Sequence, residues 1–355
     1  MQRSDTISVN DADLVTRCAA VIDVPKVAPP DSFVLHAPLE LLARAILLER
    51  APAEARPDAR ARMQWLADAY AEAGPSADPS PPPEGLAVDD VLPSLAAAGH
   101  APILLSLRPR VAAVAATFGA RLVAAELDRH PDWRLRWPAS RRTSGAGSGD
   151  LAERLAAPRS PGDAGSDFIY PTMHLTETSG LAAEVLGEPL RGLPLEEARR
   201  TLLRVAARSM LQDNPSAAPY GWTHCLTMPQ AVLVAADNGA DPELAIAVAA
   251  TYVLGFRATQ GGVRVVEDWQ PRRKSAAGRV WWASEHELPA LVSELVAFAV
   301  IHPDAHVAKY TLACLDAAFA DPDGSRLYLA AAAHLQDWWK AVPFPDDPII
   351  GGPRP

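Results

Sequence analysis

The segment VIHPDAHVAKY, residues 300–310, places two histidines and a lysine at the edge of an apolar run. His306 and Lys309 are three positions apart, so they are neighbours on one face of any helix that contains both. Lysine is rare in this chain, because it accounts for only four of the 33 basic residues and the others are arginine. Burial on an apolar face pushes a lysine toward its neutral amine, whereas arginine stays protonated. We therefore take His306 and Lys309 as candidate catalytic residues.

Three further histidines share the setting of His306. His36, His174 and His224 each fall at or near the start of an expected helix, among apolar or small residues with few charges nearby. Imidazoles that converge inside a helical bundle favour a metal site, and neutral imidazole suits iron, copper, zinc or nickel. The alternative is that each histidine is an ordinary hydrogen-bonded residue and that Lys309 extends to solvent or pairs with a nearby carboxylate.

His302 is a different case, because Pro303 biases it toward an extended backbone just before a helix. We expect a helix-start residue there, although His302 could take the place of one of the four candidate ligands. The sequence contains no HExxH pair, EF-hand loop, phosphate-binding glycine loop or GxSxG elbow. The usual zinc-protease, calcium, nucleotide and serine-hydrolase sites therefore have no support.

Helical patterns must position these residues, since alanine and leucine dominate and alternating β-branched runs are scarce. We predict one large all-α, bundle-like domain over residues 1–355, with flexible Pro/Ser/Gly-rich loops near 75–86 and 138–167. One short piece, residues 261–269, looks like a strand. The predicted helices cover 38–50 (with Pro38 at its first position), 56–74, 194–213, 228–239, 241–256, 284–301, 303–320 and 324–342.

Composition excludes several partners. The formal net charge is -10 and no basic stripe is present, so we expect no nucleic-acid binding. The longest apolar stretch, residues 101–127, contains three arginines, which a membrane span would not tolerate. Three widely spaced cysteines and an N-terminus without a signal-peptide pattern predict a cytoplasmic protein with free thiols.

Four segments carry a resemblance to a known family: HAPLELLARAIL, MHLTETSG, THCLTMPQAV and HPDAHVAKYTLACLD. They resemble the scattered motifs of the questin oxidase family, and the last is similar to its His-x-x-Lys helix. The resemblance implies a helical non-haem iron oxygenase, an oxidoreductase that oxidises or opens a ring of an anthraquinone-type polyketide with O2. It also implies that Fe(II) is held by His36, His174, His224, His306 and a carboxylated Lys309.

The chemistry of lysine fits that implied role. A neutral amine adds carbon dioxide to give a carbamate, which turns a cation into a carboxylate-like oxygen ligand, and arginine cannot do this. The sequence contains no flavin or nicotinamide motif, so electrons would come from the substrate or an external reductant. Four aromatic side chains lie beside the candidate ligands and either pack against a flat substrate or belong to the core: Tyr170, Tyr220, Trp222 and Tyr310.

Two other functions remain open from the sequence. The same ligands with zinc or manganese would activate water for hydrolysis or hydration. Alternatively, the chain is a non-enzymatic helical ligand-binding protein whose histidines belong to the core. Bound metal separates the enzymes from the binding protein, and a requirement for oxygen separates the two enzymes.

Overall fold

The computed structural model describes residues 11–22, 24, 26, 33–76, 135–137, 150–157, 168–187, 190, 192–237 and 240–350. These parts of the chain contain thirteen α-helices and no β-strand, which confirms the predicted all-α class. Lys26 and Ser76 form an isolated antiparallel bridge. Among the described helices, none combines the length and apolar character that crossing a membrane requires.

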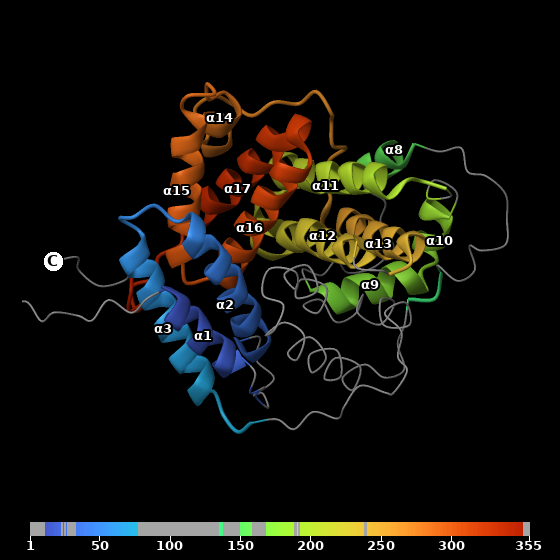
Figure 1. Cartoon of the computed structure of the whole chain (residues 1–355). Coiled ribbons are helices and arrows are strands. Elements are labelled where there is room, and N and C mark those ends of the chain that lie inside the picture. The colour runs from blue at the N-terminus through green and yellow to red at the C-terminus, as the bar shows by residue number, and fades with distance from the viewer. Residues whose placement is uncertain are drawn as a thin grey trace, which may run out of the picture.

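The helices follow one another in three groups along the chain (Figure 1). The first group is α1 (Asp11–Ile22), α2 (Phe33–Arg50) and α3 (Arg56–Glu72). The second is α8 (Leu151–Ala156), α9 (Ile169–Thr178), α10 (Leu181–Leu186), α11 (Leu195–Gln212), α12 (Thr223–Asp237) and α13 (Pro242–Gln260). The third is α14 (Ala276–Trp281), α15 (Leu288–Ile301), α16 (Ala305–Ala320) and α17 (Ser325–Lys340). Three short turns adjoin α12 and α17: η2 (Pro215–Ala217) and η3 (Ala218–Trp222) precede α12, and η4 (Pro322–Gly324) precedes α17.

Helix α16 lies in the centre of this arrangement, where α2, α12, α15 and α17 all pack against it. Every residue from Ala305 to Cys314 is buried, whichever face of the helix it occupies. A helix that is apolar on all sides belongs in the interior of a large core. The segment that carries His306 and Lys309 is therefore enclosed by helices from three distant parts of the sequence.

Two predicted helix starts are wrong in the same way. Helix α2 begins at Phe33 rather than Pro38, and α12 begins at Thr223 rather than Met228. In both cases a proline, Pro38 or Pro229, lies inside the helix instead of at its first turn. Proline removes one backbone hydrogen bond from a helix, but packing on neighbouring helices outweighs that loss. Both corrections place histidines inside helices.

The predicted loops differ from the structure in one place. Residues 151–156, within the expected loop 138–167, form α8, whose first turn is capped by Asp150. Residues 77–86 of the other expected loop, and 138–149 and 158–167 of this one, lie outside the described residues. The strand-like piece 261–269 is irregular and is held by buried Arg257, which donates to the carbonyls of Ala156 and Val263 and pairs with Asp213.

Candidate functional site

Three histidines and one lysine meet where α2, α12 and α16 pack together. The ring centre of His306 lies 4.7 Å from that of His36 and 5.1 Å from that of His224. The Nζ atom of Lys309 lies 2.8 Å from Nδ1 of His36. Four of the five predicted ligands thus come together from three helices, and we call them the histidine–lysine cluster.

The backbone leading into His224 is unusual. Residues 218–222 form a single π-helical turn, η3, which runs directly into α12. Single π turns inside helices occur frequently at functional sites, because they shift the side chains that follow by one position. The Thr223 hydroxyl donates to the carbonyls of Pro219 and Tyr220 and so ties this turn to the start of α12.

Asp304 fixes both the start of α16 and the orientation of His306. Its Oδ1 accepts the backbone N–H of His306 at 2.7 Å and contacts Nδ1 of the same residue at 3.0 Å. An ionised carboxylate only accepts, so Nδ1 carries the proton and Nε2 carries the lone pair. Burial alone would raise the pKa of Asp304, but the interaction with His306 lowers it overall. The carboxylate is therefore in the form that this arrangement requires.

The lone-pair nitrogen of His306 faces the interior. Its Nε2 atom is buried and has no hydrogen-bond partner among the described residues. Burial, followed by the nearby charge of Lys309, lowers the pKa of His306 and keeps the ring neutral. Buried polar atoms normally have a partner, and one without a partner in a native fold calls for an ion, a ligand or a role in chemistry.

The Lys309 side chain is buried, and this burial shifts the pKa of its amine. Burial lowers its pKa from 10.5 to about 8, against the opposing charges of Asp304 and Glu40. A sizeable fraction of this lysine is therefore neutral in mildly alkaline solution, whereas an exposed lysine is almost entirely an ammonium. The environment therefore shifts this amine toward its neutral form, in the direction expected from the sequence.

A buried ion pair next to the cluster was missed by the sequence analysis. Arg44 is fully buried, pairs with Glu40 and donates to the carbonyls of Ala299, Val300 and His302 at the end of α15. It thereby fastens α2 to the turn between α15 and α16. The signal was present, because Glu40 and Arg44 follow His36 at four-residue steps on one face of α2, but such a pair usually lies on the surface.

His174 is not part of the cluster as the structure places it. Helix α9 packs against α13 with a stripe of buried residues, and His174 lies off this stripe and is exposed. Its ring lies 5.7 Å from that of Tyr170. The stripe consists of Ile169, Thr172, Met173 and Thr176.

His302 is also separate from the cluster. It ends α15 in the extended conformation that the following proline favours, with φ -61° and ψ 139°. Its ring is buried between Phe298, Trp339 and Phe344, and its Nδ1 accepts the backbone N–H of Asp304. Burial lowers the pKa of His302 to about 4. Its surroundings are those of a neutral core histidine.

The four candidate aromatic residues fall into different environments. Trp222 and Tyr310 are fully buried, and the indole N–H of Trp222 donates to the Asn214 carbonyl. Tyr220 is 41% exposed, and its ring meets that of His306 edge-on with centres 5.0 Å apart. Tyr170 is partly buried. Of the four, Tyr220 therefore connects the cluster with the protein surface.

The side chains as they stand do not form a closed metal site. Within the described residues, no group of three or more histidine, cysteine, aspartate and glutamate side chains is arranged to hold a metal ion. The fourth member of the cluster is a lysine, which becomes an oxygen ligand only after carboxylation. No family model matches the chain, and neither the curated proteins nor the solved structures give a match. The functional interpretation therefore depends on the chemistry of the cluster itself and on the motif resemblance.

Proposed function

We propose that this chain is an iron-dependent oxygenase whose metal is held by His36, His224, His306 and Lys309. The observation that carries the proposal is the approach of the His36 and His224 rings to that of His306, whose buried Nε2 has no described partner, with Lys309 against His36. Neutral imidazoles are favoured ligands of iron, and the low pKa of His306 keeps this ring neutral. The donor set therefore fits the metal that the resemblance implies.

Lys309 would join this set as a carbamate. The ammonium first loses one proton; the neutral amine then forms an N–C bond to carbon dioxide, whose C=O π bond opens, and loses a second proton. A cation thereby becomes a monoanion with two oxygen donors. The pKa of about 8 makes the neutral amine accessible, which an exposed lysine does not offer. Asp304 would hold His306 in the required tautomer, as second-sphere carboxylates do for histidine ligands.

The reaction class and substrate come from the motif resemblance. Bound iron would supply activation of O2 for the oxidation or cleavage of a ring in a polycyclic aromatic, anthraquinone-like polyketide. Tyr220 supports an approach from its side of the cluster, because its half-exposed ring lies against His306 and offers a flat aromatic surface. Cys18, Cys225 and Cys314 are buried free thiols, which supports a location of this enzyme in the reducing cytoplasm.

Metal analysis tests the proposal directly. The purified protein is reconstituted with iron(II) without oxygen, desalted and measured for bound metal, and each variant is first checked for helical content. We expect near-stoichiometric iron in wild type and a large loss in His306→Ala and Lys309→Arg. His286→Ala, at an exposed histidine, is the matched control and should keep its iron.

His174→Ala distinguishes the ligand sets. The structure predicts that this variant keeps its iron, because His174 lies apart from the cluster. Absence of iron from wild type would refute the proposal and leave a core of ordinary histidines. Product formation from an anthraquinone in the absence of oxygen would instead favour the hydrolytic alternative.

A further inference from the structure

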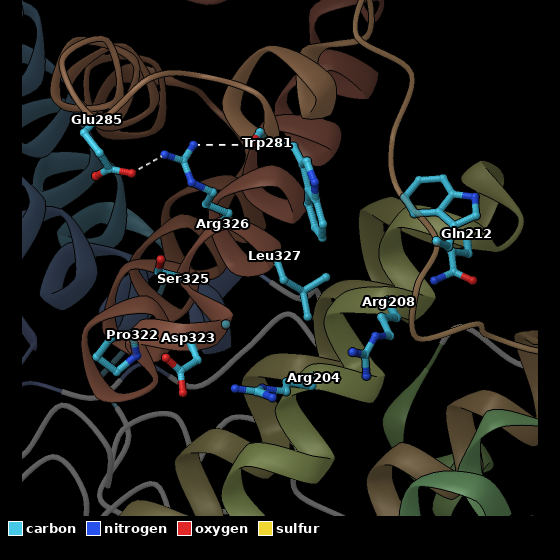
Figure 2. A pocket seen from close by; sticks show the side chains of 12 residues that line it. Arg204, Arg208, Gln212, Trp281, Glu285, Pro322, Asp323, Ser325, Arg326 and Leu327 are labelled. Carbon is cyan, nitrogen blue, oxygen red and sulfur yellow. Dashed lines mark hydrogen bonds and ion pairs between the residues drawn. The ribbon is translucent and has the colours of Figure 1, made fainter.

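A cavity lies away from the histidine–lysine cluster, between α11 and the start of α17. Its volume is about 470 Å³, within the range of small-molecule sites. None of the cluster residues line it. Figure 2 shows Arg204 and Arg208 reaching from α11 toward the start of α17, while Arg326 turns toward Glu285.

The two arginines of α11 have hydrogen-bond donors to spare. Arg204 uses Nε and Nη2 on the buried carboxylate of Asp321, at 2.7 and 2.6 Å. Arg208 makes one contact of 3.0 Å, from Nη2 to Glu267, whose side chain is 82% exposed. Among the described residues, the Nη1 atoms of both arginines and Nε of Arg208 have no partner. Both arginines line the cavity and keep donors that no described residue uses.

The cavity lining carries three arginines, Arg204, Arg208 and Arg326, and two carboxylates, Glu285 and Asp323, and Glu285 pairs with Arg326. Arg204 and Arg208 are one helical turn apart, and like charges at that spacing repel each other. Asp321 is committed to Arg204 and to the hydroxyl of Tyr328. The exposed contact between Arg208 and Glu267 is weak, because water screens it. A ligand carboxylate between the two guanidinium groups would relieve their repulsion and replace that contact with stronger charge-assisted hydrogen bonds.

Two indole rings and a leucine also line the cavity, among polar residues. Trp269 and Trp281 are partly buried on the cavity wall, and Leu327 lies on its floor at the first turn of α17. Aromatic rings stack on such surfaces in offset or edge-on arrangements. Guanidinium groups on one side and indole rings on the other select a molecule that combines an anionic group with an aromatic ring.

We propose that this cavity binds a small aromatic carboxylate, with the carboxylate on Arg208 and Arg204 and the ring against Trp281. The site is independent of the histidine–lysine cluster and of the reaction proposed there. It would serve as a binding site separate from the cluster, since none of the four cluster residues lines it.

Benzoate and its neutral isostere benzamide test this site. Binding to the full-length protein is measured by calorimetry and by quenching of tryptophan fluorescence, at concentrations up to the millimolar range. We expect benzoate to bind about tenfold or more tightly than benzamide, because the charge-assisted hydrogen bonds are lost with the amide. Arg208→Met should weaken benzoate by a similar factor, whereas Arg200→Met, at an exposed position on the same helix, should not.

Equal binding of benzoate and benzamide to wild type, or no binding of benzoate at millimolar concentration, would overturn the proposal. So would undiminished benzoate binding to a folded Arg208→Met protein. The comparison of the two ligands on wild type decides the matter even where the variant fails to fold. Unchanged benzoate binding to His306→Ala would show that the cavity acts separately from the cluster.

Discussion

Replacing Lys309 with methionine should stabilise the metal-free protein at neutral pH. Methionine keeps the length and flexibility of the lysine side chain but carries no charge. The fold currently encloses an amine whose pKa falls from 10.5 to about 8 because of burial. Each pK unit corresponds to about 1.4 kcal/mol, so enclosing the ammonium costs about 3 kcal/mol of unfolding free energy. The substitution also removes the contact between Lys309 and His36, which lowers the gain in unfolding free energy by about 1 kcal/mol.

The sign of the pH dependence follows from the same shift. Below about pH 8 the lysine is protonated in both states, and the fold bears the full cost. Between about 8 and 10.5 the unfolded chain binds more protons than the folded chain, so wild-type stability rises with pH. The advantage of Lys309→Met should therefore be about 2 kcal/mol near neutral pH and should shrink over this alkaline range.

Urea unfolding in the presence of a chelator measures the effect, with circular dichroism as the signal. Lys274→Met is the control, because Lys274 is exposed and its replacement should change stability by less than about 0.5 kcal/mol. Bicarbonate should stabilise wild type but not Lys309→Met, since carbon dioxide adds only to the amine. A Lys309→Met protein less stable than wild type at neutral pH, with the same difference at alkaline pH, would refute the reasoning.

Three further predictions concern the residues around the cluster. Asp304→Asn should weaken iron binding by roughly 10- to 100-fold in chelator competition, because the histidine it orients loses its fixed tautomer. Arg44→Leu should lower the free energy of unfolding by about 3–5 kcal/mol, since Glu40 is left buried without its partner, whereas Arg17→Leu in an exposed pair should cost under about 1 kcal/mol in the same urea assay. Burial lowers the pKa of His302 from 6.5 to about 4, so the folded protein loses stability as pH falls from 6.5 to 4. Between these two pH values, the free energy of unfolding of His302→Phe should therefore fall by about 3 kcal/mol less than that of wild type, measured by urea unfolding at each pH.

Eight of the thirteen described helices were predictable because their apolar periodicity and composition agree with the final packing: α2, α3, α11, α12, α13, α15, α16 and α17. The other five, α1, α8, α9, α10 and α14, were not predicted. The errors at Pro38 and Pro229 have one cause. Proline is favoured in the first turn of a helix, so each was read as marking a start. The structure extends both helices to earlier residues, where burial against α16 and its neighbours outweighs one missing backbone hydrogen bond. Local preference cannot include that tertiary contribution.

For the site too, the sequence predicts what local spacing determines but not what depends on packing between distant helices. His306 and Lys309 are close in sequence, and a helix brings them together whatever the rest of the chain does. His36 and His224 were predicted from their surroundings, and the structure places both against His306. His174 has equally apolar neighbours in the sequence but lies on the exposed side of α9. Which side of a short helix faces inward depends on its packing partner, and the sequence alone does not specify that partner.

The turn between α15 and α16 explains how residues far apart in the chain become one site. From α2, Arg44 holds the carbonyls of Val300 and His302 at the end of α15. On the other side of the turn, Asp304 caps α16 and orients the His306 ring. The position of α2, and with it the position of His36, is thus fixed by contacts to the same turn, residues 302–304, that orients His306. A change at Arg44 should therefore disturb the spacing of the imidazoles although the guanidinium touches neither ring, and metal affinity should report this more sensitively than helical content does.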